Sequence, residues 1–410
     1  MKNDPQAVAD ALDALQAAGR RRIRRVVQGF SAANTAARPL VDGVPLLNFC
    51  SNDYLDLARE PAVAGAMADA ARHWGSGSGA AHLVTGHSAE HHALEEELAA
   101  FTGREAALLF STGYMANVGV ISALAARGEI ILQDKLNHAS LLDGARLSDA
   151  TLQRYRHADA DDAARLAGAS GGRLSLIATD GVFSMDGDIA PLRELARIAR
   201  EQQAWLLVDD AHGLGVMGAT GRGSLELAGL GEDDVPLLVG TLGKAFGSFG
   251  AFVAGRREVI ELVMQRARSY IFTTALPPAV AAASRAALAA LRQQDWRRVR
   301  VLEAVRRFRE AAATRGIALM PSTTPIQPVP VPGAARCAAA SDALRERGYW
   351  VAAIRSPTVP VGTERLRVTL TAAHRNEDID GLADALAEVL RELPANAAQV
   401  ADAPSPVVAP

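Results

Sequence analysis

A lysine and a carboxylate lie at the ends of two apolar segments that are candidates for neighbouring strands. Lys244 follows the apolar run 237–241 within a glycine-rich stretch, and Asp209 ends the apolar run 205–208. Because amines and carboxylates are costly to bury unpaired, their position where strands end indicates a site rather than packing. In open parallel α/β sheets, ligands bind at the carboxyl ends of the strands. We therefore expect Lys244 and Asp209 to hold one ligand from two ends.

Other polar groups also lie where a strand gives way to a loop or helix. Asp210 and His212 come directly after Asp209, and His138 follows the strand expected at 130–134. Two adjacent carboxylates at a sheet edge could instead bind magnesium. If Asp209 alone contacts the ligand, Asp210 is left without a role.

The segment around Gly113 could bind an anion. A strand expected at 107–110 is followed by a helix that Gly113 and Tyr114 open. The N-terminus of a helix presents free backbone N–H groups and the positive end of the helix dipole, which suits a phosphate. A capped helix start without any ligand explains the same residues, so this segment does not decide the matter alone.

Together these groups match the needs of pyridoxal 5'-phosphate. This cofactor requires a lysine for covalent attachment, a carboxylate that keeps its ring nitrogen protonated, and an anion site. Lys244, Asp209 and the helix start at Gly113 could supply them, and His212 could donate to the phenolate oxygen of the ring. The apolar, glycine-flanked setting of Lys244 would lower its pKa toward neutrality, as this chemistry requires. The alternative is an ordinary loop lysine.

The elements that position these residues alternate between strands and helices. Five apolar runs read as strands, at 107–110, 130–134, 174–179, 205–209 and 237–241. This rhythm predicts an α/β fold with a doubly wound, mostly parallel sheet. Residues 251–254 follow the last run closely enough to form an antiparallel neighbour. The pattern after residue 325 is β–α–β–β–α, which predicts a smaller α+β C-terminal domain.

The chain is long enough for two domains and an arm. We expect an N-terminal helix and arm over 1–56, a large cofactor-binding domain over 57–295, and the C-terminal domain over 296–393. The helix is expected at about 5–28 and ends in the basic cluster 20–25. The tail 394–410 is rich in Ala, Pro and Val and is expected to be disordered.

Composition excludes several classes of function. The 410-residue chain has a formal net charge of −3, which gives no electrostatic reason to expect nucleic acid or membrane partners. No apolar run is long enough to span a membrane, and the N-terminus lacks a secretory signal pattern. Two cysteines fit a reducing compartment. We therefore expect a cytoplasmic protein.

A histidine-rich stretch is the weakest of the candidate sites. His87 and His91 have i, i+4 spacing, and both are expected just before a helix at 93–101. No acidic third ligand is obvious, so a zinc site is disfavoured and no metal is expected.

Several longer motifs resemble the α-oxoamine synthases. These motifs are Ser51–Leu55, Asn137–Ser140, Gly181–Gly187, Val208–Gly213 and Thr241–Gly247. The resemblance covers residues from about 10 to 392, and the combination is specific although each motif alone is not. It implies a fold-type-I enzyme that uses pyridoxal phosphate to join an amino acid to an acyl thioester with loss of carbon dioxide.

The resemblance also implies roles for individual residues that contact the cofactor. Lys244 would form the covalent link and transfer protons, Asp209 would pair with the ring nitrogen, and His138 would stack on the ring. The remaining contacts are expected at the phenolate oxygen and the phosphate, from His212, Ser184, Gly113, Tyr114 and Thr241.

Substrate contacts are implied in the same way. Arg355 would bind the amino-acid carboxylate as a fork, a role that lysine could not copy, with Thr358 beside it. Asn52 belongs to a family motif and is expected to contact substrate. One arginine of the cluster 20–25 would contact substrate, most simply Arg21, with Arg22 as the neighbouring alternative.

The segment 353–367 resembles the biotin-pathway branch of the family. It implies condensation of L-alanine with pimeloyl-CoA or a pimeloyl carrier-protein thioester, in a homodimer where Thr273 or Thr274 reaches the phosphate from the partner subunit. The loop 79–83 and Ser356 depart from the family pattern. The alternatives are a glycine-using or serine-using member, such as glycine C-acetyltransferase or serine palmitoyltransferase, and a non-catalytic subunit of the same fold.

Overall fold

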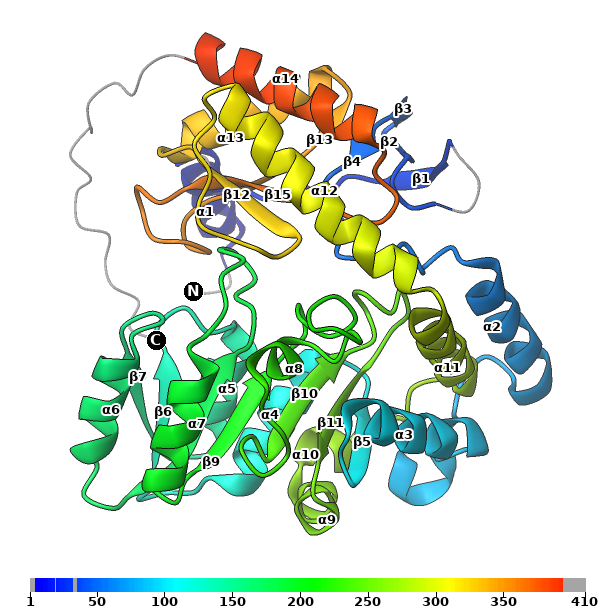
Figure 1. Cartoon of the computed structure of the whole chain (residues 1–410), viewed down its shortest axis with the longest axis vertical. Coiled ribbons are helices and arrows are strands. Elements are labelled where there is room, and N and C mark those ends of the chain that lie inside the picture. Colours follow the sequence, from blue (N-terminus) through cyan, green and yellow to red (C-terminus); the bar gives the residue numbers. More distant parts are fainter. Residues whose placement is uncertain (1–3, 19, 32–34, 394–410) are drawn as a thin grey trace.

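The computed structural model describes residues 4–18, 20–31 and 35–393. Its main element is a seven-stranded sheet with the order β5-β11-β10-β9-β8-β6-β7 (Figure 1). The strands are β5 (Ala106–Phe110), β6 (Ile130–Asp134), β7 (Thr151–Tyr155), β8 (Leu174–Asp180), β9 (Trp205–Asp209), β10 (Leu237–Thr241) and β11 (Ala251–Gly255). The strands from β10 to β7 are parallel, and β11 runs antiparallel to both β10 and β5. The predicted α/β class and the antiparallel neighbour are confirmed.

Helices cover both faces of this sheet. Successive side chains of each strand point to opposite sides, so each strand contributes buried side chains to both faces. Leu206 and Val208 of β9 belong to one core, whereas Leu207 belongs to the other. The first face is covered by α2 (Pro61–Trp74), α3 (Ala89–Thr102), α6 (Ala160–Gly168), α7 (Leu192–Glu201), α8 (Ser224–Ala228) and α11 (Pro278–Gln293). The opposite face is covered by α4 (Gly113–Leu124), α5 (Ala139–Leu147), α9 (Arg257–Arg266) and α10 (Arg268–Ile271).

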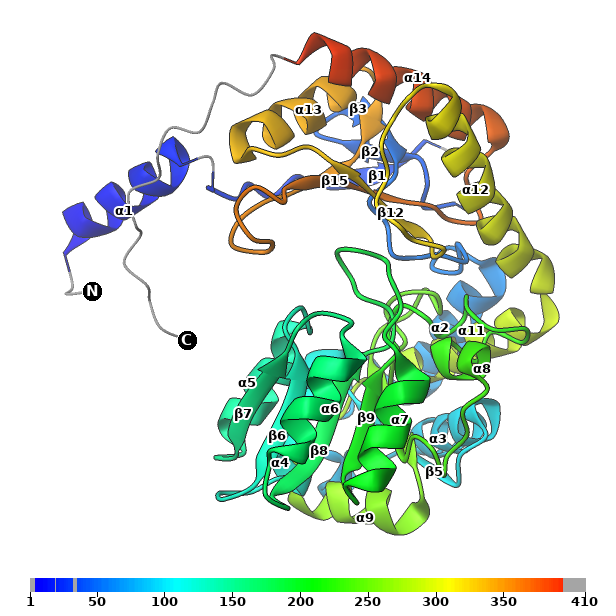
Figure 2. The same ribbon diagram turned by 60° about the vertical axis from the view of Figure 1, so that its left-hand side comes forward.

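A second, smaller sheet has its own core. It has the order β12-β15-β14, formed by Ile326–Pro330, Arg365–Thr369 and Ala352–Ile354, with both pairings antiparallel. Its helices are α12 (Asp295–Thr314), α13 (Ala334–Glu346) and α14 (Asn376–Glu392). Phe49 inserts into this core, and the short strand β4 (Leu47–Asn48) pairs in parallel with β13 (Tyr349–Trp350). Figure 2 shows this α+β unit facing one end of the large sheet.

The N-terminal helix is shorter than predicted. Helix α1 spans Pro5–Ala17 and buries none of its residues, and Figure 2 shows it standing apart from both sheets. The arginines of the cluster 20–25 lie after this helix, in a segment that leads to β1 (Val27–Phe30). Like charges three or four residues apart destabilise a helix, and here no buried face offsets that repulsion. Strand β1 pairs with β2 (Pro39–Val41), which also pairs with β3 (Val44–Pro45).

Helix α3 begins earlier than predicted, at Ala89, so His91 and His92 lie inside it rather than before it. Ser88 caps its N-terminus together with the His91 side chain, which explains the early start.

The predicted disordered tail 394–410 lies outside the described residues, and the domain boundaries at 57, 296 and 393 stay a prediction. Across the described ranges, the helices are too short or too polar to cross a membrane.

Candidate active site

Lys244 lies in the loop that follows β10, at the carboxyl end of the large sheet. Its Nζ is 2.8 Å from Nε2 of His212. Burial lowers the pKa of Lys244 to about 8, although the nearby Asp209 and Asp180 act in the opposite direction. This amine therefore loses its proton close to neutral pH, as a lysine that forms covalent bonds and moves protons must.

Asp209 is the last residue of β9 and is only 6% exposed. Its Oδ2 accepts a hydrogen bond from Nδ2 of Asn117 at 2.6 Å, and its Oδ1 accepts one from the backbone N–H of Ala211 at 3.0 Å. These two neutral donors fix the orientation of the carboxylate without cancelling its charge. A carboxylate held in this way can pair with a cationic ring nitrogen brought by a ligand.

Asp180 is a third carboxyl group at this edge, and the sequence reasoning did not single it out. It ends β8 directly opposite Asp209. Burial, followed by the charge of Asp209, raises the pKa of Asp180 well above its usual range. Its Oδ2 accepts a hydrogen bond from the backbone N–H of His138 at 2.7 Å. Asp180 therefore positions His138 through the backbone at the start of α5.

His138 caps the start of α5 and keeps an exposed side chain. Its Nδ1 is 2.7 Å from Oγ of Ser140. Desolvation lowers the pKa of His138, and its charge interacts with both Asp209 and Lys244. The structure thus brings a neutral imidazole ring to the same place as the predicted lysine and carboxylate.

His212 connects Lys244 to a buried tyrosine. While its Nε2 faces Lys244, its Nδ1 is 2.6 Å from Oη of Tyr54. Burial and then the charge of Lys244 lower the pKa of His212 well below its usual value. A neutral imidazole between an amine and a phenol can accept from one and donate to the other. Tyr54 lies in a motif noted in the sequence, yet its contact with His212 was not predicted.

The predicted phosphate-binding segment is the capped N-terminus of α4. Oγ1 of Thr112 caps α4 by accepting the backbone N–H of Met115 at 3.1 Å, while Gly113 and Tyr114 form the first turn. First-turn N–H groups have no partner within a helix, so they can donate to an anion. Thr241 ends β10, where its Oγ1 donates to the Gly250 carbonyl at 3.1 Å.

Arg367 is a functional candidate that the sequence reasoning missed. This buried side chain on β15 reaches across to the large sheet. Its Nε donates to the Ser184 carbonyl at 2.7 Å, and its Nη1 donates to Oδ1 of Asn52 at 3.1 Å and to Oγ1 of Thr369 at 2.9 Å. Its positive charge also contributes to the low pKa of Lys244. Arg367 therefore links the predicted residues Asn52 and Ser184 to the Lys244 group.

A signal for Arg367 was present in the sequence. Arg365 and Arg367 alternate with apolar residues on one strand, so both point to the same face of the small sheet. Both are buried, and Arg365 pairs with Asp186. Arginines are almost never fully buried unless they are paired, so two alternating arginines in an apolar strand indicate partners in another part of the fold.

The other predicted substrate residues lie around two different cavities. Arg21 and Arg355 line a cavity of about 380 Å³ together with Arg25 and Trp350. Arg355, Thr358 and Arg22 line a second cavity of about 330 Å³. Lys244 lines neither cavity. Arg355 therefore lines both cavities, Arg21 only the first and Thr358 only the second, whereas Asn52 belongs to the Lys244 group.

Asp210 points into a pocket formed by glycines. Its Oδ2 accepts the backbone N–H of Ser224 at 2.7 Å. A Cβ atom at Gly213 or Gly223 would collide with its carboxyl group, and one at Gly181 would lie 2.6 Å from Oδ1. Burial raises the pKa of Asp210 to about 7. Asp210 therefore fastens the turn that follows β9 to the start of α8, a structural role that the sequence left open.

The donor set fits pyridoxal phosphate. A deprotonatable amine, an oriented carboxylate, an exposed imidazole and a helix N-terminus follow or end the strands β10, β9, β6 and β5, in that order, at the carboxyl ends of these strands. Each matches one part of the cofactor in chemical type: its aldehyde, its ring nitrogen, its ring face and its phosphate.

Comparison with known proteins places the chain in a family. The model of the family "Aminotransferase class I and II" matches residues 44–386. An 8-amino-7-oxononanoate synthase from Methylococcus capsulatus is 58% identical over 382 residues, which cover 93% of this chain and 98% of the relative.

Two solved structures have the same fold. Serine palmitoyltransferase from Sphingomonas wittichii superposes with a TM-score of 0.89 at 31% identity, covering 95% of this chain and 98% of the other. Serine palmitoyltransferase from S. paucimobilis with a bound PLP–myriocin aldimine superposes with a TM-score of 0.88 at 30% identity, covering 94% and 97%. The chain therefore belongs to the aminotransferase class I and II family of fold-type-I enzymes and groups within it with the 8-amino-7-oxononanoate synthases.

Proposed function

We propose that the protein is a pyridoxal-phosphate-dependent acyltransferase of biotin biosynthesis that condenses L-alanine with a pimeloyl thioester. The products are 8-amino-7-oxononanoate, carbon dioxide and the free thiol of coenzyme A or of a carrier protein. The observation that carries this proposal is the 58% identity, over nearly the full length of both chains, to a protein named 8-amino-7-oxononanoate synthase. The convergence of Lys244, Asp209, His138 and His212 supports it independently.

Lys244 is proposed to move the protons of the reaction. Bound pyridoxal phosphate supplies an aldehyde that links to amines and a ring that takes up the electron pair of a substrate carbanion. With its pKa near 8, Nζ of Lys244 can take the proton from Cα of alanine and later return one. Nε2 of His212, 2.8 Å away, holds this amine in place and can accept a hydrogen bond from it.

Asp209 is proposed to keep the ring nitrogen of the cofactor protonated. Its carboxylate is buried and fixed by Asn117 and Ala211, so it can stabilise a positive charge with little reorganisation. His138 would cover the ring, Ser184 and His212 would contact the phenolate oxygen, and the first turn of α4 with Thr241 would hold the phosphate.

Two arginines are candidates for the carboxylate of alanine. Arg355 is the one that the family resemblance implies, and it lies with Arg21 around the cavity described above. The positive charge of Arg367 lowers the pKa of Lys244, and its Nη1 donates a hydrogen bond to Oδ1 of Asn52. We propose that Arg367 binds the amino-acid carboxylate at the reacting centre, while Arg355, Arg21 and Thr358 contact the acyl donor, whose pimeloyl end is also anionic.

Two further points concern assembly and location. The protein is expected to form a homodimer, because Val8, Leu12 and Leu15 leave an exposed apolar stripe on α1. Thr273 or Thr274 would then reach the phosphate of the partner. The cytoplasm is the proposed location, since Cys50 and Cys337 are free thiols.

A direct substrate comparison tests the function. The purified holoenzyme is offered alanine, glycine or serine, each with pimeloyl-CoA, acetyl-CoA or palmitoyl-CoA, and the products are identified by mass spectrometry. The expected result is that alanine with pimeloyl-CoA gives the highest kcat/KM and the mass of 8-amino-7-oxononanoate. Preference for serine with palmitoyl-CoA would instead favour a serine palmitoyltransferase, in line with the fold shared with those enzymes.

A further inference from the structure

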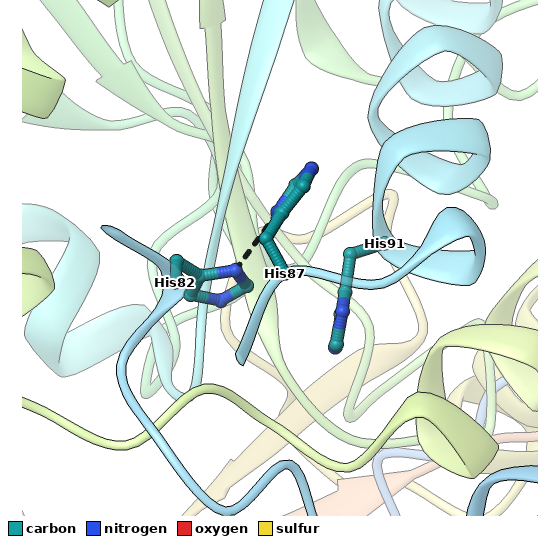
Figure 3. A group of neighbouring side chains, drawn as sticks. All are labelled: His82, His87 and His91. Carbon is teal, nitrogen blue, oxygen red and sulfur yellow. Dashed lines mark hydrogen bonds between the residues drawn. The ribbon is translucent and has the colours of Figure 1, made fainter. Parts of the chain in front are cut away.

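Three histidines gather beside the start of α3. His82 comes from the π-helical turn His82–Gly86, His87 follows that turn, and His91 lies in the first turn of α3. Figure 3 shows their rings side by side, with Nδ1 of His82 3.0 Å from Nδ1 of His87. One ring nitrogen from each of the three lies within 4.8 Å of the others. The sequence spacing indicated only His87 and His91, and the π-helical turn adds His82.

The Nε2 nitrogens of two of these rings lie near oxygen atoms, one within hydrogen-bond distance and one beyond it. Nε2 of His91 is 2.7 Å from the carbonyl oxygen of Leu276, and Nε2 of His87 is 4.0 Å from a carboxylate oxygen of Glu95. Metal-binding histidines typically donate their second N–H to a carbonyl or a carboxylate, which fixes the tautomer and turns the other nitrogen toward the ion. In both rings the other nitrogen is Nδ1. That of His87 lies 3.0 Å from Nδ1 of His82, and that of His91 accepts the backbone N–H of Ser88 at 3.0 Å and lies 2.9 Å from Oγ of Ser88.

The short distance between His82 and His87 also suits a shared cation. A tetrahedral ion with Zn–N bonds of about 2.0–2.1 Å places two ligand nitrogens about 3.3 Å apart, close to the separation seen here. Burial and the neighbouring imidazoles lower the pKa of His82 to about 3 and also lower the pKa of His87. Both rings are therefore neutral at physiological pH, and neutral imidazole is the form that binds metals.

We propose that His82, His87 and His91 bind one divalent transition-metal ion, with Zn²⁺ as the best match, through a nitrogen of each ring. His87 would carry its proton on Nε2, and Glu95, now 4.0 Å from that atom, would have to approach to accept it. His91 would release both the Ser88 N–H that its Nδ1 accepts at 3.0 Å and Oγ of Ser88 at 2.9 Å. The His87 side chain is 30% exposed, which gives the ion a path from solvent and leaves the fourth position to water.

Such an ion would stabilise the loop that precedes α3. Leu276 O accepts a hydrogen bond from Oγ of Ser78 at 2.6 Å as well as the one from His91, and the Ala275 N–H donates to Ala80 O at 3.0 Å. The histidine group therefore lies where the glycine-rich loop 75–79 and the segment ending at Leu276 meet. Metal binding would raise the unfolding temperature by mass action because the unfolded chain lacks the assembled site.

The test is a cobalt(II) titration of the untagged holoenzyme after metal removal. Visible d–d bands report tetrahedral coordination of Co²⁺, and equilibrium dialysis with Zn²⁺ gives the stoichiometry. We expect one ion per chain and a higher unfolding temperature with Zn²⁺. H82Q and H87Q should each weaken Zn²⁺ binding by at least tenfold and remove the tetrahedral bands, and E95Q should weaken it less. H73Q removes an exposed histidine outside the group and is the matched control.

Two results would overturn the proposal. One is the lack of stoichiometric Zn²⁺ binding by the folded holoenzyme. The other is unchanged affinity in the double variant H82Q/H87Q, which would leave a metal-free network in which His82 and His87 share a hydrogen bond. Far-ultraviolet circular dichroism and the cofactor absorbance of each variant show that the fold is retained, so a lost site is distinguished from a lost structure. The readouts do not depend on turnover and stand apart from the proposed function.

Discussion

Two carboxylate–imidazole groups lie at the ends of strands in the large sheet, and they differ in how their charges are matched. Near the end of β6, Nδ1 of His157 is 3.0 Å from Oδ1 of Asp134, and its Nε2 is 2.9 Å from Oδ2 of Asp188. These two carboxylates raise the pKa of His157 to about 9 against the effect of burial. Near the ends of β9 and β10, by contrast, Lys244 contacts the neutral imidazole of His212, and the pKa of Lys244 falls to about 8.

This difference in charge neutralisation distinguishes the structural group around His157 from the reactive group around Lys244. The imidazolium of His157 is neutralised within the protein, and its ring packs edge-on against Phe183 at a centroid distance of 4.5 Å. It thereby fixes the loop that leads to Ser184. The amine of Lys244 and the carboxylate of Asp209 are held in place by neutral groups instead, so their charge and their proton stay available to a ligand. Buried charged groups alone do not identify the site. What identifies it is that the charges of Lys244 and Asp209 are not neutralised by direct hydrogen-bond partners.

Replacing Lys244 should have the largest effect. We expect Lys244→Ala to lower kcat by about 10⁴-fold, because the proposed proton carrier and covalent attachment are both lost. Covalent retention of the cofactor after borohydride reduction, read by mass spectrometry, should disappear as well. The chain has only two other lysines, Lys2 and Lys135, and the exposed Lys135 provides the control variant Lys135→Ala. Unchanged turnover in Lys244→Ala would contradict the proposed mechanism.

Replacing Arg367 should affect substrate binding next. Lysine keeps the charge but loses the fork, so Arg367→Lys should raise KM for alanine by about 10–100-fold, as expected for lost charge-assisted hydrogen bonds. The comparison variant is Arg355→Lys, for which we expect the larger change in KM for the pimeloyl thioester. If Arg355→Lys raises KM for alanine more than Arg367→Lys does, Arg355 is the carboxylate fork.

Replacing His157 should change stability more than chemistry. His157→Gln should lower the free energy of unfolding by about 2 kcal/mol near pH 6, because two charge-assisted hydrogen bonds are lost, with at most a severalfold change in kcat. The folded-state pKa is raised to about 9, so this stabilisation is complete below about pH 6.5 and is lost as pH rises through 9. Urea unfolding at pH 6, 8 and 9.5 measures it, and a stability difference that does not shrink with pH would disprove the charged pair.

The sequence predicted those site residues whose signal is local. Lys244 and Asp209 stand at the ends of apolar runs, and the alternation of strands and helices was sufficient to place both at one sheet edge. Asp180 was missed because its strand was taken to end at Thr179. Arg367 was missed because its partners Asn52 and Ser184 are distant in sequence, and only the packing of the small sheet against the large one brings them together.

Local conformation explains the remaining differences. In the sequence, the helical spacing of apolar residues in α1 continues into the arginine cluster 20–25. The helix nevertheless ends at Ala17, because consecutive positive charges without a buried face do not sustain a helix. His82 was not associated with His87 and His91 because a spacing of five residues matches no turn of an ordinary α-helix. It matches the wider π-helical turn, which sequence periodicity does not reveal.

The glycines around Asp210 limit which substitutions this part of the sequence can accept. Positions 181, 213 and 223 come from separate turns, and each lacks a side chain where the same carboxyl group sits. An alanine at any one of them would collide with the aspartate at 210. A smaller residue at 210 would relieve the collision at Gly213, whereas at Gly181 a Cβ atom would still lie 2.5 Å from Oγ of Ser224. At Gly223 the positive φ of 90° adds a backbone cost that no change at 210 removes. Substitutions at positions 210 and 213 are therefore coupled, and a tolerated change at 213 depends on the residue already present at 210.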